Sequence, residues 1–463
     1  MKKLKILINY LVAFVLMVVI SSSLAQETYA IKGTIVTPDQ VIEGGTILIQ
    51  GNLIKEVGAN MNLPAGTVVF DTQGIILPGF VDLHNHLTWN LLPRWKPGIQ
   101  FSNRYEWQLL PSYGIALATP HGQLMKENLG CEMSRYAEVK AIIQGETSVV
   151  GGLFPAQECE KGFARNLDSY SGLKRSNGQS EEKLSYEVFP LELDATNLAT
   201  IYSGLDNGQL TAFIVHLAEG KPNDASAIRE FKMFDKRGLL RPGVSIIHGI
   251  SLKQADFHKM KSKGVGLIWS PRSNIELYGA TTDVAAALLE KVEIALSPDW
   301  SPTGSNGMLA ELKYAAVWNA GQSTSIFSNQ ELVRMATLYP SKLARLDGQI
   351  GAIAPGLHAD LVVLRKNEAD AYDAIVHADP LDIELVVIDG KPVYGNLEPM
   401  KKLLPDQQLE TIMLCGREKM INLAGESQLQ RTKPKSWAEI TQDLSTALQK
   451  WGSSLAPIAD CTN

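Results

Sequence analysis

The sequence predicts an α/β fold, a (β/α)₈ barrel of the TIM type joined to a small β-sandwich that both ends of the chain build. Apolar runs separated by helical stretches fill the middle of the chain, which is the pattern of βα units. Short glycine-punctuated strands come before and after this middle region, so one small all-β module is expected from both termini. A length of 463 residues suits a barrel with an accessory module.

The predicted domain boundaries follow these patterns. Residues 26–75 and 350–398 are assigned to the composite β-sandwich, residues 76–349 to the barrel, and residues 399–463 to a C-terminal helical extension. Apolar residues recur at helical spacing in this extension, namely Trp437, Ile440, Leu444, Leu448 and Trp451. We expect that helix to pack on the body of the protein.

The barrel strands are expected as eight apolar runs. They are residues Ile75–Val81, Thr147–Leu153, Phe163–Asn166, Leu184–Leu193, Leu210–His216, Val244–His248, Val265–Trp269 and Val292–Leu296. The carboxyl ends of such strands meet at one face of the barrel, where barrel enzymes carry their active sites.

The first of these strands leads into two histidines separated by one residue. Side chains alternate along a strand, so His84 and His86 are expected to project to the same side. Two imidazoles converging at the carboxyl end of a barrel strand are half of a divalent-metal site.

Three later strand ends carry side chains of the same chemical kind. His216 ends one strand and is followed by Glu219, His248 ends the next, and Asp299 follows the last. A lone histidine at a strand end is usually structural, and a lone aspartate usually caps the next helix. Four such ends in one barrel would form a single ring of ligands.

Taken together, these motifs resemble the amidohydrolase superfamily. The resemblance is greatest to its mononuclear branch, which includes the cytosine, guanine and adenosylhomocysteine deaminases and the triazine chlorohydrolases. The matching segments are residues 78–86, 216–219, 248, 270–274, 299 and 351–360.

The resemblance implies that His84, His86, His216 and Asp299 hold one divalent metal ion. Three imidazoles and a carboxylate suit Zn²⁺, with Fe²⁺ as the alternative. Such an ion lowers the pKa of its bound water and so activates that water at neutral pH.

The resemblance also implies three catalytic roles. His248 would stabilise the charge that develops at the attacked carbon, Asp299 would take a proton from the water, and Glu219 would pass a proton to a ring nitrogen or leaving group. Binuclear relatives need a bridging residue at the end of the fourth strand. No lysine ends that strand here, and Glu192 is the only candidate bridge for a two-metal alternative.

Four residues are candidates for substrate binding. Arg94 and Arg104 lie in the long segment between the first two barrel strands, which should overhang the barrel mouth and could grip an anionic or aromatic substrate. The alternative is that this segment is held by its own packing. Asn274 closes the matching 270–274 motif. Trp300 stands where the deaminases carry a small residue, which puts the deaminase substrates themselves in question.

The predicted function is an exported, metal-dependent amidohydrolase that hydrolyses carbon–nitrogen bonds other than peptide bonds. The favoured reaction is deamination or ring opening of a heterocyclic small molecule. Hydrolysis of an N-acyl, cyclic amide or carbon–chlorine bond, and a non-catalytic binding protein on the same scaffold, are the alternatives. A formal charge of −6 without a basic tract argues against nucleic acid as a partner. The sequence leaves a homo-oligomer open.

Residues 1–25 are predicted to be a cleaved signal peptide. Three lysines precede the apolar run Leu11–Ile20, and small residues lead to a cleavage point after Ala25. An uncleaved membrane anchor is the alternative, although the run is short for a full span. Cleavage would remove three positive charges and no negative ones, changing the formal charge from −6 to −9. The mature protein would then be periplasmic or secreted and free of the membrane.

Export bears on the four cysteines because disulfides persist in oxidising compartments. Sequence proximity favours the pairs Cys131–Cys159 and Cys415–Cys461 among the three possible pairings. Buried free thiols are the alternative.

Overall fold

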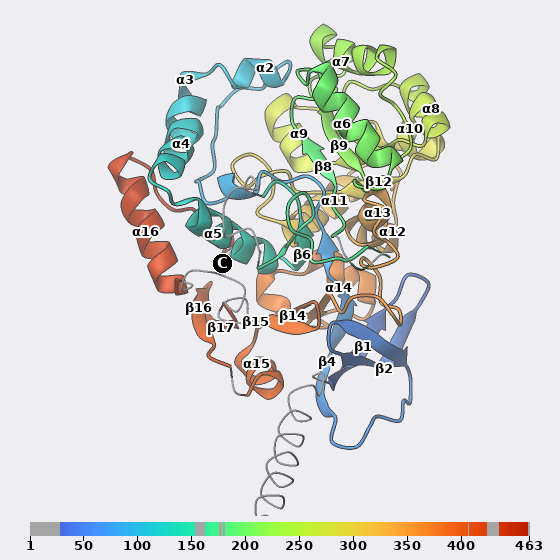
Figure 1. Ribbon diagram of the computed structural model, residues 1–463, viewed down its shortest axis with the longest axis vertical. Coiled ribbons are helices and arrows are strands. Elements are labelled where there is room, and N and C mark those ends of the chain that lie inside the picture. Colours follow the sequence, from blue (N-terminus) through green and yellow to red (C-terminus); the bar gives the residue numbers. More distant parts are fainter. Residues whose placement is uncertain are drawn as a thin grey trace, which may run out of the picture.

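The computed structural model describes residues 28–152, 163–175, 178, 181–405, 407–423 and 435–461. It consists of an α/β barrel and a large β-sheet beside it (Figure 1). The predicted signal peptide lies outside the described residues. Among the helices that are described, none combines the length and the apolar character needed to cross a membrane.

The described part of the barrel contains eight short strands that run parallel. They are β5 (Phe80–Val81), β6 (Glu146–Val149), β7 (Arg165–Asn166), β8 (Ser185–Glu187), β9 (Phe213–Leu217), β10 (Val244–His248), β11 (Gly266–Trp269) and β12 (Ile294–Leu296). Strands β5 to β7 pair in one sheet and β8 to β12 in another.

Backbone hydrogen bonds join these two sheets at both seams. The amide of Leu184 donates to the carbonyl of Leu167 over 3.0 Å, next to β7 and β8. The amide of Asp299 donates to the carbonyl of His84 over 3.0 Å, between the ends of β12 and β5. The predicted α/β barrel is therefore confirmed, and its second seam lies directly at the predicted metal ligands.

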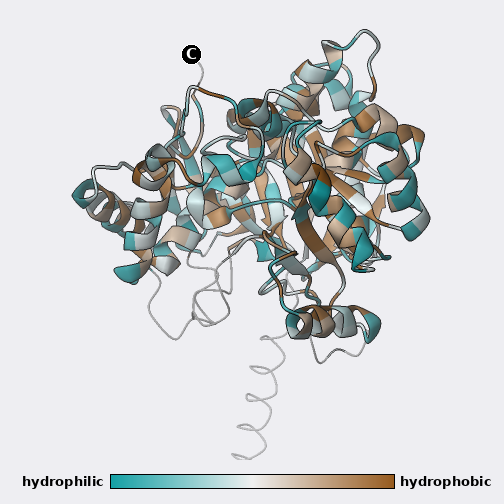
Figure 2. Cartoon of the chain, turned by 90° about the horizontal axis from the view of Figure 1, so that it is seen from above, coloured by the Kyte–Doolittle hydropathy of each residue, from teal (hydrophilic) through white to brown (hydrophobic). Residues whose placement is uncertain are grey.

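Helices follow most barrel strands and cover the outside of the barrel. They are α6 (Ala195–Asp206), α7 (Ala225–Lys236), α8 (Gln254–Lys263), α9 (Pro271–Tyr278), α10 (Val284–Leu289), α11 (Met308–Ala320), α12 (Asn329–Ala336) and α13 (Leu338–Leu343). Three begin at an aspartate whose carboxylate accepts first-turn amide hydrogens, namely Asp194, Asp224 and Asp283. Figure 2 shows hydrophobic residues concentrated on the interior strands, while the helices around them also carry hydrophilic residues.

The large sheet beside the barrel contains nine strands in the described residues and is built from both ends of the chain. The N-terminal strands are β1 (Thr28–Val36), β2 (Val41–Gln50), β3 (Leu53–Gly58) and β4 (Val68–Pro78). The C-terminal strands are β13 (Leu361–Leu364), β14 (Ile383–Ile388), β15 (Lys391–Gly395), β16 (Glu410–Leu414) and β17 (Arg417–Ile421). Strand β4 pairs with β13, which joins the two groups into one continuous sheet.

The predicted first barrel strand is divided between the large sheet and the barrel. This corrects the predicted boundary between the β-sandwich and the barrel. Residues 75–78 complete β4, whereas Phe80 and Val81 form β5. Gly79 lies at the junction, where a Cβ atom would come within 2.2 Å of the Thr147 side chain. A continuous apolar run cannot reveal this junction because both halves are buried.

The C-terminal extension is only partly helical, which is a second correction. The predicted helix is present as α16 (Trp437–Lys450), but β16 and β17 form a hairpin, and α15 (Leu397–Leu403) precedes it. Because β17 pairs with β15, this hairpin extends the large sheet beyond residue 398.

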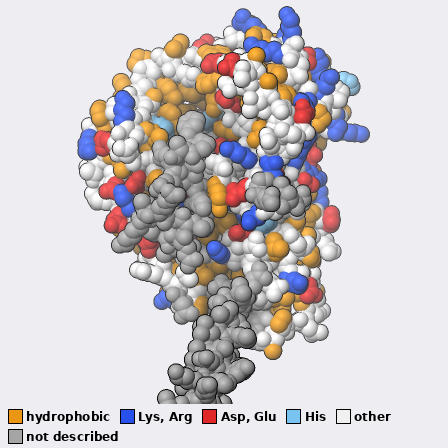
Figure 3. All heavy atoms as spheres, in the orientation of Figure 1, with side chains coloured by type: hydrophobic (Ala, Val, Ile, Leu, Met, Phe, Trp, Pro, Cys, Tyr) orange, Lys and Arg blue, Asp and Glu red, His pale blue; other side chains and the backbone are white. Residues whose placement is uncertain are grey.

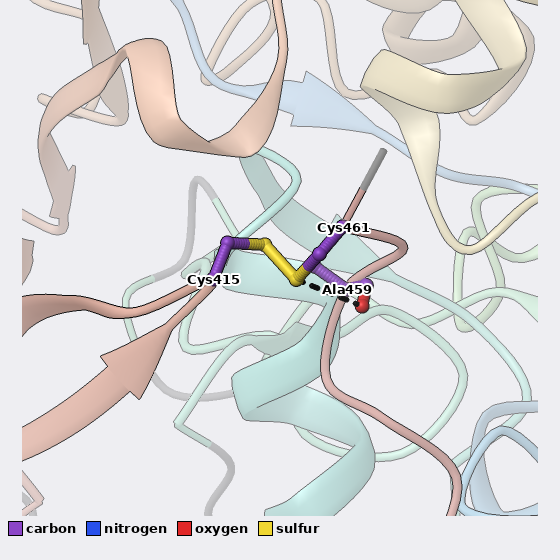
Figure 4. Close-up of a disulfide and its surroundings, with 3 residues drawn as sticks. All are labelled: Cys415, Ala459 and Cys461. Carbon is purple, nitrogen blue, oxygen red and sulfur yellow. Dashed lines mark hydrogen bonds between the residues drawn. A yellow bond between two sulfur atoms is a disulfide. The ribbon is translucent and has the colours of Figure 1, made fainter. Parts of the chain in front are cut away.

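A disulfide joins this hairpin to the end of the chain. Cys415, in the turn between β16 and β17, is bonded to Cys461 (Figure 4). This pairing is one of the two that sequence proximity favours. The other involves Cys159, which lies outside the described residues.

The long segment after β5 forms a helical cap with an irregular backbone. It contains a 3₁₀ turn (Leu87–Trp89), α2 (Arg104–Trp107), α3 (Pro111–Tyr113), a π-helical turn (Gly114–Ala118), α4 (Thr119–Lys126) and α5 (Gly130–Ile142). Helix α16 lies beside α4 and α5 (Figure 1). The rings of Tyr136 and Trp437 stack with their centroids 5.3 Å apart, which ties the extension to this cap.

Candidate metal and active site

The carboxyl ends of three barrel strands bring the four predicted ligands together. His84 and His86 follow β5, His216 lies in β9, and Asp299 follows β12. The Nε2 atoms of His84 and His86 lie 3.1 and 3.5 Å from Oδ1 of Asp299. The ring centroids of His84 and His216 are 4.7 Å apart. The structure thus places all four predicted ligands at one point.

Two overlapping groups of side chains there have the spacing of a metal site. In the described residues these are His84, His86 and Asp299, and His84, His216 and His248. Within each group the ligand atoms lie within 4.8 Å of one another. His84 is common to both, so the two groups describe one centre.

Three buried polar atoms at this centre have no hydrogen-bond partner among the described residues. Nε2 of His84, Nε2 of His216 and Oδ1 of Asp299 make no hydrogen bond with the part of the chain that the structure describes. Buried polar atoms normally have a partner, and each without one needs an explanation. A cation bound by nitrogen and oxygen ligands is such a partner, and this donor set fits a tetrahedral zinc site.

The opposite ring nitrogens are held in place by other groups. Nδ1 of His84 lies 2.7 Å from Oγ of Ser270, and Nδ1 of His216 lies 3.2 Å from the carbonyl of Glu187. A donor proton on Nδ1 leaves the Nε2 lone pair free to bind a metal. For His216 this tautomer is required, because a carbonyl can only accept.

Burial sets the charge of these groups. It lowers the pKa of His84 and His216 well below the ordinary value, so both imidazoles are neutral at pH 7, the form that binds metal. Burial also raises the pKa of Asp299, an effect opposed chiefly by His248 and His86. A divalent cation would provide the positive charge that favours the Asp299 carboxylate.

Two residues of the site have left-handed backbone conformations. The φ angles are 65° for His248 and 70° for Asp299. Such conformations cost on the order of 1–3 kcal/mol for residues other than glycine, and they concentrate at functional sites. The Thr282 hydroxyl donates to the carbonyl of His248 over 2.5 Å and helps to hold that residue.

His248 lies beside His84, with the two ring centroids 4.6 Å apart. Its Nδ1 lies 2.8 Å from Oδ1 of Asn274, and its Nε2 lies 3.6 Å from Oε2 of Glu219. The amide oxygen of Asn274 can only accept, so the proton is on Nδ1, and Nε2 faces the pocket and Glu219.

Glu219 is held by groups that the sequence analysis did not single out. Tyr278 donates to Oε1 of Glu219 over 2.5 Å, and the indole of Trp107 donates to the Tyr278 hydroxyl over 2.9 Å. Ser273 similarly donates to Oδ2 of Asp299 over 2.5 Å. Ser273 belongs to the matched 270–274 segment, but no local pattern marks Tyr278, which becomes relevant only when α9 packs against the site.

A cavity of about 540 Å³ opens in front of this centre. Its size is in the range of small-molecule sites. It is lined by His86, Trp89, Trp107, Gln108, Tyr113, Glu187, Val188, Phe189, His216, Glu219, His248, Leu277, Asp299 and Trp300. Figure 3 shows hydrophobic side chains, with histidine atoms among them, around a hollow in the upper part of that face.

Of the predicted substrate-binding residues, the structure places only Trp300 in the cavity wall. Arg94 pairs with Glu276 over 2.6 Å and donates to the carbonyl of Gly304. Asn274 is fully buried behind His248. Both side chains are occupied by other protein groups, so the predictions for Arg94 and Asn274 are corrected.

The prediction that Arg104 binds substrate is also corrected, because its buried side chain contacts acidic residues of the protein. Its side chain is 1% exposed, forms an ion pair with Glu230 over 3.0 Å and lies 3.8 Å from Glu219. It also donates to the carbonyl of Val188 over 2.6 Å. The positive charge of Arg104 is therefore balanced within the protein, and both arginines fit the alternative in which this segment is held by its own packing.

The candidate bridge for a second metal is not at the centre. Glu192 is exposed in the turn after β8, whereas Glu187 ends that strand and lines the cavity. Neither residue belongs to the ligand groups found in the described chain. The error arose because the predicted strand, Leu184–Leu193, was longer than the observed one.

One further aromatic residue was missed by the sequence analysis. His121 stacks on Trp89 with ring centroids 4.0 Å apart and planes 9° apart. Its Nε2 lies 3.0 Å from the Thr88 hydroxyl. His121 therefore supports the cavity wall, although its sequence context resembles that of an ordinary loop residue.

Part of the chain matches a known protein family. Residues 206–393 match the amidohydrolase family, and this segment contains β9 to β12 with His216, Glu219, His248 and Asp299. The chain carries an amidohydrolase family domain. The predicted family and the predicted enzyme class, a hydrolase of carbon–nitrogen bonds other than peptide bonds, are thereby confirmed.

Individual relatives are distant but match most of the chain. A 5-methylthioadenosine/S-adenosylhomocysteine deaminase of Caldanaerobacter subterraneus is 21% identical over 78% of this chain and 90% of the relative. A 5′-deoxyadenosine deaminase of Methanobrevibacter smithii is 23% identical over 76% of this chain and 88% of the relative.

A solved structure shares the whole architecture. An adenosine deaminase from Xanthomonas campestris with bound zinc superimposes with a TM-score of 0.66 at 16% identity. The match covers 92% of this chain and 98% of that protein. At this identity the likeness establishes the fold, and the chemistry is argued from the site itself.

Proposed function

We propose that this amidohydrolase is a zinc-dependent deaminase of an adenine nucleoside or a closely related heterocycle. The observation that carries the proposal is the convergence of buried, unsatisfied ligand atoms from β5, β9 and β12 beside Glu219, at the floor of an aromatic cavity. The names of the relatives support an adenine-bearing substrate.

The proposed reaction replaces an exocyclic amino group with oxygen. Zinc held by His84, His86, His216 and Asp299 would supply Lewis-acid activation of a water molecule. Water adds to the ring carbon, that carbon releases its amino group as ammonia, and the product carries a carbonyl in its place. The protons of the water end on the ring and on the departing ammonia.

In the proposed reaction, side chains of the site move these protons. Asp299 is the general base, and its Oδ2 is oriented by the Ser273 hydroxyl. Glu219 protonates the ring nitrogen through Oε2, the carboxylate oxygen that faces His248, while Tyr278 holds Oε1. Nε2 of His248 stabilises the charge that develops at the attacked carbon.

Ammonia release tests the proposed reaction. Purified protein loaded with zinc should release ammonia from 5′-methylthioadenosine, and Glu219→Gln should lower kcat by at least about 100-fold with metal content unchanged. Formation of a carboxylate or chloride from other heterocycles, without ammonia release from any amine tested, would replace deamination with one of the alternative hydrolytic reactions. Asp256→Asn, in the first turn of α8, is a control for expression and handling.

We also propose export by cleavage after Ala25, which the basic and apolar pattern of residues 1–25 supports. The Cys415–Cys461 disulfide supports the same view because such bonds persist in oxidising compartments. N-terminal sequencing of protein from the periplasm or culture medium should begin at Gln26. An intact Met1 on protein retained in the cytoplasm would contradict export.

A further inference from the structure

The cavity also indicates which substrates the enzyme selects. Resting on the proposed deaminase function, we infer that the cavity selects nucleosides whose 5′ substituent is uncharged and apolar, and rejects those bearing a carboxylate or phosphate. The selection follows from two features of the described residues: a continuous aromatic wall and a cavity lining without lysine or arginine.

Aromatic rings form an unbroken wall from the metal centre outward. The ring of Trp300 lies 5.7 Å from that of His86, 5.9 Å from Trp89 and 5.8 Å from Trp107. Tyr113 continues the wall at 5.1 Å from Trp107. These separations are those of interacting aromatic pairs, which offer planar faces to a heterocycle and apolar surface to its substituent.

The rest of the described lining adds apolar surface and few polar groups. Val188, Phe189 and Leu277 are its apolar members. Outside the metal centre and Glu219, the polar side chains on the described lining are the Tyr113 hydroxyl, the Gln108 amide and the Glu187 carboxylate.

The lining that the structure describes contains neither lysine nor arginine, while Glu187, Glu219 and Asp299 are acidic. Arg94 and Arg104, two arginines of the cap, are already paired with Glu276 and with Glu230. An incoming carboxylate or phosphate would therefore meet negative charge and apolar surface.

The physical penalty for such a substrate is large. An anion moved from water into a mostly apolar cavity loses hydration, and without a paired cation nothing compensates that loss. Sites that leave a buried polar or charged group unpaired discriminate strongly, so we expect selectivity of roughly 100-fold or more. A methylthio group has no such penalty and gains contact with the aromatic wall.

Two matched substrate pairs test the inference. 5′-Methylthioadenosine is compared with S-adenosylhomocysteine, which carries a charged amino-acid tail, and adenosine is compared with adenosine 5′-monophosphate. Both kcat/KM for ammonia release and Kd are measured. Quenching of tryptophan fluorescence reports Kd, since Trp89, Trp107 and Trp300 line the cavity. The uncharged member of each pair should be favoured by about 100-fold or more in both quantities.

The two readouts separate failure of the inference from failure of the proposed function. Equal kcat/KM and equal Kd within each pair would overturn the selectivity and leave the deaminase function standing. Selective binding without ammonia release would overturn the function and support the selectivity. Failure of 5′-methylthioadenosine to bind at all would overturn both.

A charge inserted into the wall provides a matched variant. Gln108→Arg places a cation at a half-buried lining position and should reduce the discrimination against S-adenosylhomocysteine by at least about 10-fold. Gln108→Met removes the amide without adding charge and should retain the preference. If the arginine and methionine variants show the same preference as each other, charge is not the basis of the selection.

Discussion

Two histidines of the centre, His216 and His248, have their tautomer fixed by the group that contacts Nδ1. A carbonyl holds His216 and an amide oxygen holds His248, so both Nε2 atoms are left as acceptors directed inward. The difference between the two is their neighbour. His248 lies beside Glu219 and the cavity, whereas Nε2 of His216 is buried without a hydrogen bond in the described chain. We therefore propose His216 as a ligand and His248 as a catalytic group.

Replacement of His248 tests this division. His248→Ala should lower kcat by at least about 100-fold, because a group that stabilises transition-state charge is lost. Elemental analysis should find unchanged zinc, since the four proposed ligands remain. Loss of zinc from this variant would make His248 a ligand, as its place in the second ligand group allows.

Because His121 is partly buried, we expect the free energy of unfolding to decrease as the pH falls below neutrality. Burial lowers its pKa to about 4, so the unfolded chain, with a histidine pKa of about 6.5, takes up a proton first as pH falls. The contribution of neutral His121 to the free energy of unfolding is therefore complete above about pH 6.5 and is lost as the pH falls towards 4. His121→Phe keeps a ring against Trp89 and should reduce the acid loss of unfolding free energy, by at most about 3 kcal/mol.

Urea unfolding at pH 7 and pH 4.5 measures this effect. His258→Phe is the control because that side chain is 76% exposed. Identical acid sensitivity of the His121→Phe variant and the original protein would show that another group controls it.

At the scale of elements, strand ends were more predictable than strand lengths. Val244–His248 was predicted with the observed bounds, because a β-branched run ends directly in a polar residue. Strand β8 is only Ser185–Glu187, and the prediction of a longer strand led to Glu192 instead of Glu187. Residues that become neighbours only through packing, such as Tyr278 against Glu219, leave no signal in local sequence.

The C-terminal hairpin depends on its disulfide to the end of the chain. The bond closes a loop of 46 residues, for which chain entropy gives a stabilisation of about 4 kcal/mol. The double variant Cys415→Ser/Cys461→Ser should lower the urea unfolding free energy by roughly that amount. The same measurement on the original protein with and without a reductant is the control, and equal stability in all cases would contradict a structural role.

At the scale of the whole molecule, the barrel brings together residues that are distant in sequence. His84 and Asp299 are 215 positions apart in the printed numbering, yet they face each other across the seam between β5 and β12. The fold class and the ligand ends could be predicted because a closed parallel barrel gathers strand ends in one ring. The structure of the cap could not be predicted, because no general rule says where irregular helices bring their side chains. For this reason Arg94 and Arg104 were wrongly predicted to bind substrate.

The most direct test of the central claim is a zinc titration of the metal-free protein, read by calorimetry. The account predicts tight binding of about one zinc ion per chain, as expected for three imidazoles and one carboxylate. It also predicts that His216→Ala lowers the affinity by at least about 10-fold. Binding of zinc with unchanged affinity after His216→Ala, or failure of the original protein to bind zinc, would contradict a metal centre built from these strand ends.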